Sequence, residues 1–241
     1  MTLLTICNAL ADYTSGPRPA TIAQNTNPDA QNYLRIVNKV GKKLMKVYPW
    51  NILRKEHTFT AAGTETLIAA ASMPTDFDRF IPETFWDRST SVLLSGPITA
   101  PDWAGLKASS YTGDNPKFTY RGGIVLAIPT VSSGDSMAFE YIASKYLTDT
   151  TGVTPKVEFT VDTDVALLDE ELIALAATYD WLVSEGQPAQ GAFADFKNYF
   201  DTLQDNENAT ENIMVTADLF AQSSRHSTGI PVASRTVVLS S

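Results

Sequence analysis

The residue types that could do chemistry are few and widely separated. The chain contains two histidines, His57 and His226, and one cysteine, Cys7. No serine sits in a G-x-S-x-G elbow, so the sequence offers almost no residues from which a histidine-activated nucleophile could be built. Cys7 falls on the apolar face of a helix expected over residues 3–13, which predicts a buried small hydrophobe and not a reactive thiol.

Metal and cofactor sites are not indicated either. A zinc site is not expected, because there is no second cysteine and no pair of histidines three or four residues apart. An EF-hand loop opening at Asp162 would place Ala166 where an oxygen ligand is needed and Leu167 where a glycine is needed. We therefore expect no metal and no cofactor, and interpret the acids after residue 161 as partners of the positive N-terminal end of a helix.

A group of acids mixed with aromatic residues is the strongest enzymatic alternative. Sugar-processing sites combine paired carboxylates with aromatic rings, but core aromatics beside solvated turn acids give the same pattern. We expect no catalytic residue and no enzyme, and keep a polysaccharide-binding or polysaccharide-hydrolysing protein as an alternative. The acids are Asp76, Asp78, Glu83 and Asp87, among Phe77, Phe80, Phe85, Trp86 and Trp103.

Length and composition bound the class of protein. With 241 residues and 44% hydrophobic residues, the chain can fill a real core without disulfides. The net charge of −9 argues against a free-standing nucleic-acid binder, because neutralising phosphates needs clustered cations. No apolar stretch approaches the roughly 18 residues of a membrane span, and no signal peptide is recognisable, so we expect a soluble, unprocessed protein without membrane insertion.

Charge is segregated along the chain. Between Arg35 and Lys55 there are seven cations and no acid, whereas between Asp162 and Glu211 there are twelve acids and one cation, Lys197. Both blocks fall on expected helices, where they could pair within one subunit or between subunits. The sequence leaves both open. The candidate interface, with another subunit or with a partner protein, comprises Arg35, Lys39, Lys42, Lys43, Lys46, Asp169, Glu170 and Glu171.

Hydrophobic periodicity predicts helices at both ends and strands between them. A helix over 3–13 is followed by one that Asn27 caps, that has Pro28 in its first turn and that Pro49 stops. From residue 50 to 160 the runs become short and β-rich, with hairpins around Gly63 and Gly122-Gly123, a strand from about 137 to 141 and a short helix over 101–108.

The remaining pattern is helical and then polar. Thr163 or Asp164 is expected to cap a third helix that ends near Gly186, and a fourth follows Pro188. The predicted class is α+β, in which N-terminal and C-terminal helices form a bundle, with an inserted antiparallel β domain and an extended C-terminal arm. The expected ranges are 1–49 and 161–205 for the bundle, 50–160 for the β domain and 206–241 for the arm, which could order on a partner.

Several stretches, taken in order, resemble one family. They are Met1-Thr2-Leu3-Leu4-Thr5-Ile6-Cys7-Asn8, Trp50-Asn51-Ile52-Leu53-Arg54-Lys55-Glu56-His57-Thr58-Phe59-Thr60, Met73-Pro74-Thr75-Asp76-Phe77-Asp78-Arg79-Phe80, Tyr120-Arg121-Gly122-Gly123, Phe139-Glu140-Tyr141-Ile142, and Phe159-Thr160-Val161-Asp162-Thr163-Asp164 running into Leu167-Leu168-Asp169-Glu170-Glu171-Leu172. Over roughly residues 1–205 they resemble the head-to-tail adaptor, or tail tubular protein A-like, family of short-tailed bacteriophages (podoviruses). The specificity lies in their order and spacing.

The resemblance implies a structural role in a virion. It implies a ring, dodecameric in the family, that docks beneath the portal protein, receives the tail nozzle protein and surrounds the DNA channel. DNA would pass without sequence-specific binding, and tail fibres are a further partner. The location would be the neck or tail of the phage, assembled in the host cytoplasm. The nearest alternative is a neck connector of a long-tailed phage.

Overall fold

The structure is a computed structural model that describes residues 2–207. It combines helices with antiparallel sheets, which confirms the α+β class. Most of the predicted arm, from residue 208 to 241, and His226 lie outside the described residues. Among residues 2–207, no helix is both long and apolar enough to cross a membrane.

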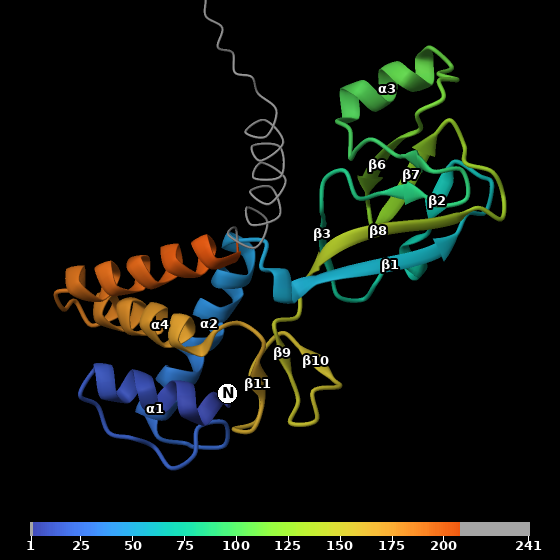
Figure 1. Cartoon of the computed structure of the whole chain (residues 1–241). Coiled ribbons are helices and arrows are strands. Elements are labelled where there is room, and N and C mark those ends of the chain that lie inside the picture. Colours follow the sequence, from blue (N-terminus) through green and yellow to red (C-terminus); the bar gives the residue numbers. More distant parts are fainter. Residues whose placement is uncertain (1, 208–241) are drawn as a thin grey trace, which may run out of the picture.

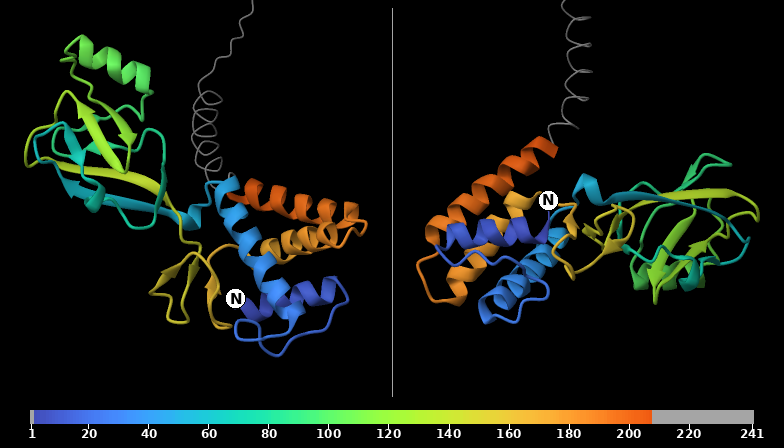
Figure 2. Two further views of the ribbon diagram at one scale, coloured as in Figure 1. Left: turned by 180° about the vertical axis from the view of Figure 1, so that it is seen from behind. Right: turned by 90° about the horizontal axis from the view of Figure 1, so that it is seen from below.

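The helices near the two ends of the described chain share one hydrophobic core. Helices α1 (Leu3–Tyr13), α2 (Pro28–Val47) and α4 (Glu170–Ser184) contact one another, and a helix over 190–207 lies against the same core. Asn27 caps α2 as predicted, since its side chain accepts a hydrogen bond from the Asp29 backbone N–H. Figures 1 and 2 show these helices gathered on one side of the molecule.

The other half of the molecule is built from strands. One sheet has the order β1-β8-β4-β5, with β3 also pairing with β8, and a second has the order β2-β7-β6. Short helix α3 (Ala100–Ala108) lies at the far end (Figure 1). The strands are β1 (Arg54–Thr60), β2 (Thr66–Ile68), β3 (Phe77–Phe80), β4 (Trp86–Asp87), β5 (Val92–Leu93), β6 (Lys117–Arg121), β7 (Ile124–Ile128) and β8 (Ser136–Ala143), and 3-10 turns cover Asn51–Leu53 and Ala70–Ser72.

A third, small sheet borders the helices. It has the order β10-β9-β11, formed by β9 (Leu147–Thr148), β10 (Pro155–Lys156) and β11 (Val165–Ala166). Thr2 forms an isolated bridge with Val165, and the Leu3 N–H donates to the Asp164 carbonyl at 3.1 Å. The start of α1 is therefore tied to a segment more than 150 residues away.

Two separate hydrophobic cores result. The helical core includes Leu172, Tyr146 and Ile142, and the core of the β half is rich in aromatic rings such as Phe118 and Phe139. Strand β8 contributes to both cores, because Phe139 lies in one and Ile142 in the other. In Figures 1 and 2, strands β1 and β8 bridge the two halves.

The hairpin predicted around Gly122-Gly123 is confirmed, and the one around Gly63 is wrong. Strands β6 and β7 pair in register up to Arg121↔Ile124. Strand β1 pairs with β8 and β2 with β7, so the residues flanking Gly63 never pair with each other. The physical reason is that the Ala61 N–H donates to the Asp135 carbonyl, which keeps the chain beside β8 after β1 ends.

The predicted start of the third helix is also wrong. Neither Thr163 nor Asp164 caps it: α4 begins at Glu170, and the Asp169 side chain accepts from the Leu172 N–H at 3.0 Å. The carboxylate of Asp164 instead closes a turn by accepting from the Thr160 and Val161 N–H groups. Val165 and Ala166, which follow that turn, form β11 and so separate Asp164 from the helix.

Candidate functional site

The predicted basic residues lie along the exposed side of α2. The apolar residues of this helix, such as Val37 and Leu44, face the core, so the lysines between them face solvent. The side chains of Lys39, Lys42 and Lys43 are 49%, 39% and 61% exposed. One helix face thus presents a row of cations.

Part of this charge is neutralised within the chain. Lys39 pairs with Asp180 of α4 at 2.6 Å, Lys43 lies 3.5 Å from the same carboxylate, and Lys42 pairs with Glu158. Arg35 contacts the Asn32 side chain at 2.7 Å. Among residues 2–207, neither Arg35 nor Lys46 has an acidic partner. The face therefore keeps an excess of positive charge.

A shallow groove opens beside these cations. It has a volume of about 350 Å³. Its lining residues are Gln31, Leu34, Arg35, Asn38, Lys39, Lys42 and Glu158. The cations that line the groove suit an acidic protein surface.

The predicted acidic residues lie elsewhere on the helical half. Asp169 is used as the cap of α4, and the Tyr13 hydroxyl of α1 donates to Glu171. This hydrogen bond is the main reason that the pKa of Tyr13 rises to about 12, and the nearby charge of Asp195 adds to it. Burial, followed by the charge of Asp169, raises the pKa of Tyr199. Acids of α4 and of helix 190–207 therefore gather around two tyrosines.

The two charged groups point in different directions. Glu171 and Asp180 are nine positions apart on α4, and at about 100° per residue they project from opposite sides of that helix. Asp180 faces α2 and its lysines, whereas Glu171 faces α1. The lysines of α2 and Glu171 therefore lie on different sides of the helical half, so the structure does not join the predicted basic residues to Glu171 within one chain.

Sequence reasoning did not single out three of these acids. Asp180, Glu158 and Asp195 belonged to the acidic block or its border, but no sequence pattern said which would meet a lysine. The signal for Asp180 was its position on the same helix as the apolar residues that pack against α2. Glu158 lies in a loop, where no periodicity fixes direction.

Three of the predicted acids of the β half, Asp76, Asp78 and Asp87, have structural partners. Asp76 is 8% exposed and accepts from Lys55 at 2.6 Å and from the Tyr141 hydroxyl at 2.9 Å. Burial would raise the pKa of Asp76, but the Lys55 and Tyr141 hydrogen bonds outweigh it and hold the pKa below its ordinary value. Asp78 contacts Arg79, and Asp87 accepts from two backbone N–H groups of a turn.

The aromatic residues next to those acids mostly fill the core. Phe85 is 2% exposed, and Phe77 and Phe80 pack against the same cluster. His57 stacks on Phe59, and burial lowers its pKa. No three residues among His, Cys, Asp and Glu are grouped to hold a metal ion anywhere in residues 2–207.

Cys7 has the surroundings of an unreactive thiol. It is fully buried in the helical core. Burial, with a smaller contribution from the charge of Asp162, raises its pKa to about 12. Because the thiolate is the reactive form, this side chain packs as a small apolar group.

Comparison with known proteins does not name a family. A scan against models of protein families finds none that matches the chain, and a search of curated proteins finds no match.

Proposed function

We propose that this chain is the structural subunit of a head-to-tail adaptor ring, which joins the portal to the tail nozzle of a short-tailed phage and lines the DNA channel. Copies of the chain would contact one another head to tail through the helical half. In this role the protein is not an enzyme and uses no cofactor, and its partners are further copies, the portal and the nozzle.

The observation that carries the proposal is the placement of opposite charges on different sides of one helical unit. A contact between two different surfaces is heterologous, and repeated by rotation it closes into a ring. The exposed face of α2 is basic, and the far side of α4 is acidic around Glu171 and Asp195. Each copy thus offers both halves of one electrostatically complementary contact.

The basic face suits acidic protein better than phosphate. Its lysines are interleaved with acids that already engage them, Glu158 and Asp180. A groove of mixed sign fixes the register of a protein partner, whereas phosphate binding is favoured by cations without acids nearby. A conduit that carries net negative charge would also let DNA pass without holding it.

Electron microscopy tests the proposal directly. The purified chain is mixed with the portal ring from the same source and examined in negative stain. Added density with the rotational symmetry of the portal is the expected result. Bare portals beside free monomers would contradict the adaptor assignment, and envelope binding or polysaccharide hydrolysis would then be assayed.

Charge reversal tests the contact between copies. Reversing Lys42, Lys43 and Lys46 to Glu should weaken ring assembly and portal binding, while Lys107→Glu, a reversal of an exposed lysine on α3 in the β half, should not. Pairing that triple variant with a second protein carrying Glu171→Lys and Asp195→Lys should restore mixed assembly, because the signs match again. Assembly and portal affinity unchanged by the triple reversal would exclude this contact.

A further inference from the structure

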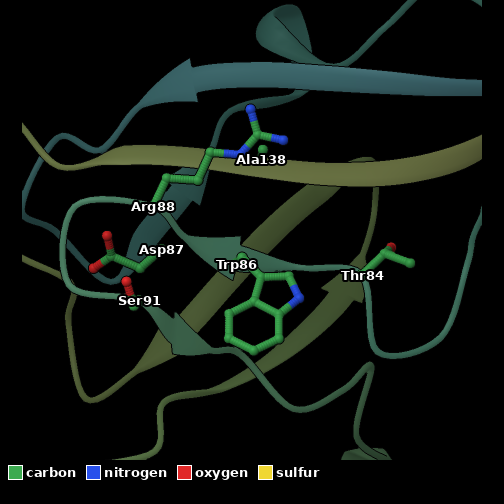
Figure 3. A pocket seen from close by; sticks show the side chains of 6 residues that line it. All are labelled: Thr84, Trp86, Asp87, Arg88, Ser91 and Ala138. Atoms are coloured by element: carbon green, nitrogen blue, oxygen red, sulfur yellow. The ribbon is translucent and has the colours of Figure 1, made fainter.

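The outer face of the β1-β8-β4-β5 sheet carries a hollow beside an exposed tryptophan. Trp86 of β4 lies opposite Ala138 of β8 in the register, and Thr58 of β1 lies opposite the other side of Ala138. Because the Ala138 side chain is small, it leaves a depression between Trp86 and Thr58 on this face of the sheet. The hollow has a volume of about 320 Å³ and is shown in Figure 3. It is lined by Thr84, Trp86, Asp87, Arg88, Ser91 and Ala138.

The exposure of Trp86 is unusual for this chain. Trp86 is 42% exposed, whereas Trp50 and Trp103 are each 4% exposed. Figure 3 shows the indole ring between the Thr84 and Ser91 side chains, with the Arg88 guanidinium next to Ala138. Tryptophan and arginine beside a pocket are the residue types that dominate the energy of protein interfaces. The residues around the hollow are therefore typical of a protein–protein contact.

Its polar groups indicate what kind of ligand fits. The Thr84 hydroxyl already donates to the Ile81 carbonyl at 2.8 Å and accepts from the Glu140 N–H at 3.1 Å. The Asp87 carboxylate accepts from turn N–H groups, and Arg88 pairs with Glu56. A sugar would need many free donors and acceptors, so the hollow suits an uncharged apolar side chain.

The chain itself presents such a side chain. Val153, in the turn between β9 and β10, is 77% exposed, more than any other large hydrophobic residue among 2–207. The Asp149 carboxylate accepts from the N–H groups of Thr151 and Val153 at 3.1 Å and of Thr154 at 3.3 Å. These hydrogen bonds hold the turn in one shape before any contact, which lowers the entropy cost of binding.

The position of the turn leaves it free to reach another molecule. In Figure 1 and both views of Figure 2, the β9–β10 turn projects away from the helices and from the β half. Its tip, Thr150-Thr151-Gly152-Val153-Thr154, contains no charged residue. An uncharged tip matches a hollow whose carboxylate already accepts hydrogen bonds and whose arginine is already paired with Glu56.

We propose that the Trp86 hollow of one copy receives the Val153 turn of the next copy. A knob and a hollow at different places on one chain make a heterologous contact, as a ring requires. The inference rests on the proposed ring, because it names a second contact between neighbouring copies. It is independent of the charged contact of the helical half.

Cross-linking between two variants tests the contact. One protein carries Val153→Cys and the other Ser91→Cys, a nearly isosteric change at the rim of the hollow. They are mixed in full-length form under a mild oxidant. Cys7 is buried and does not compete. A mixed disulfide dimer is expected, because the Val153 turn seated in the hollow would lie beside Ser91 at its rim, and a disulfide needs its two Cα atoms within about 7 Å of each other. Val153→Cys mixed with Ser184→Cys is the control and should stay unlinked.

Self-association gives a second readout. Trp86→Ala and Val153→Asp should each weaken it by about tenfold or more in sedimentation, whereas Val183→Asp, at another exposed valine, should have little effect. The absence of a mixed disulfide dimer overturns the proposal, whether the chain sediments as monomers or as oligomers.

The outcomes separate this contact from the adaptor role. Oligomers or symmetric portal density without the mixed disulfide would leave the ring and remove this contact. The disulfide without portal binding would keep the contact and remove the adaptor role. If polysaccharide quenches the fluorescence of the native chain but not of Trp86→Phe, and no disulfide forms, the hollow is a sugar site and the proposal fails.

Discussion

Replacing Asp164 by alanine should strongly destabilise the helical half. The residue is 1% exposed, and its carboxylate accepts from Lys156 at 2.6 Å and from the backbone N–H groups of Thr160 at 2.8 Å and Val161 at 3.0 Å. The Asp164 carbonyl also accepts from the Leu3 N–H, so the turn it closes holds the start of α1. One side chain thus orders a segment on which a distant helix depends.

The magnitude follows from what the alanine variant leaves behind. A hydrogen bond to a charged group contributes about 1.5–3 kcal/mol, and removing one partner of a buried ion pair costs about 3–5 kcal/mol. Both descriptions cover the same contacts and are not added. Lys156 is 25% exposed at its side chain, so water can take over part of its charge. We therefore expect a loss of about 3–4 kcal/mol in the free energy of unfolding.

Urea unfolding followed by circular dichroism measures this loss. The matched control is Asp149→Ala. Like Asp164→Ala it removes a carboxylate that accepts from backbone N–H groups, of which Asp149 has three. Asp149 lies in an open turn, so water can replace its hydrogen bonds and the effect should be clearly smaller. A loss below about 1 kcal/mol for Asp164→Ala, or equal losses for both variants, would refute the reasoning from burial.

Three further predictions concern acid, a thiol and a glycine. Burial would raise the pKa of Asp164 and of Asp76, but their hydrogen-bond donors hold both pKa values below the ordinary value. The stabilising effect of both carboxylates is therefore present above about pH 4 and is lost as the pH falls through the folded-state pKa. Asp164→Ala should flatten the acid limb of the stability curve, measured by urea unfolding between pH 5 and 2. Cys7, whose pKa burial raises to about 12, should not react with a thiol reagent at pH 8 until urea unfolds the helical core; modification of the native chain at the rate of a free thiol would contradict its buried position. Alanine favours helices over glycine, but Gly41→Ala should lower the free energy of unfolding by about 1–3 kcal/mol in thermal unfolding. The reason is that the alanine Cβ would lie 2.4 Å from the Tyr146 ring. A stabilised variant would show that the ring moves freely.

The elements that the sequence predicted best have strong local signals. Helix α2 combines a cap at Asn27, a proline at its first position and a continuous apolar face, and the β6–β7 hairpin has two glycines at positive φ angles of 60° and 78°. Each signal lies within a few residues of the element it specifies, so tertiary contacts had little to decide.

The errors arose where distant residues decide the structure. Gly63 does turn the chain, at a φ angle of 74°, but the partners of β1 and β2 are found more than 50 residues away. Asp164 resembles a helix cap in sequence, yet Lys156 and a preceding turn engage its carboxylate first. Among the candidate interface residues, the row of lysines on α2 followed from periodicity, while their partners Glu158 and Asp180 did not.

The pairing of Arg54 with Ile142 has a consequence for how this architecture can change. These residues are opposite each other at the two ends of the β half, so the chain enters and leaves it at neighbouring points, roughly 5 Å apart between Cα atoms. The segment between them can be lengthened, shortened or exchanged while the helical core keeps the same two attachment points, as long as Ile81, which packs against that core, is kept or matched. A lineage could therefore replace most of the segment from 55 to 141 to suit a new partner and keep its helical scaffold.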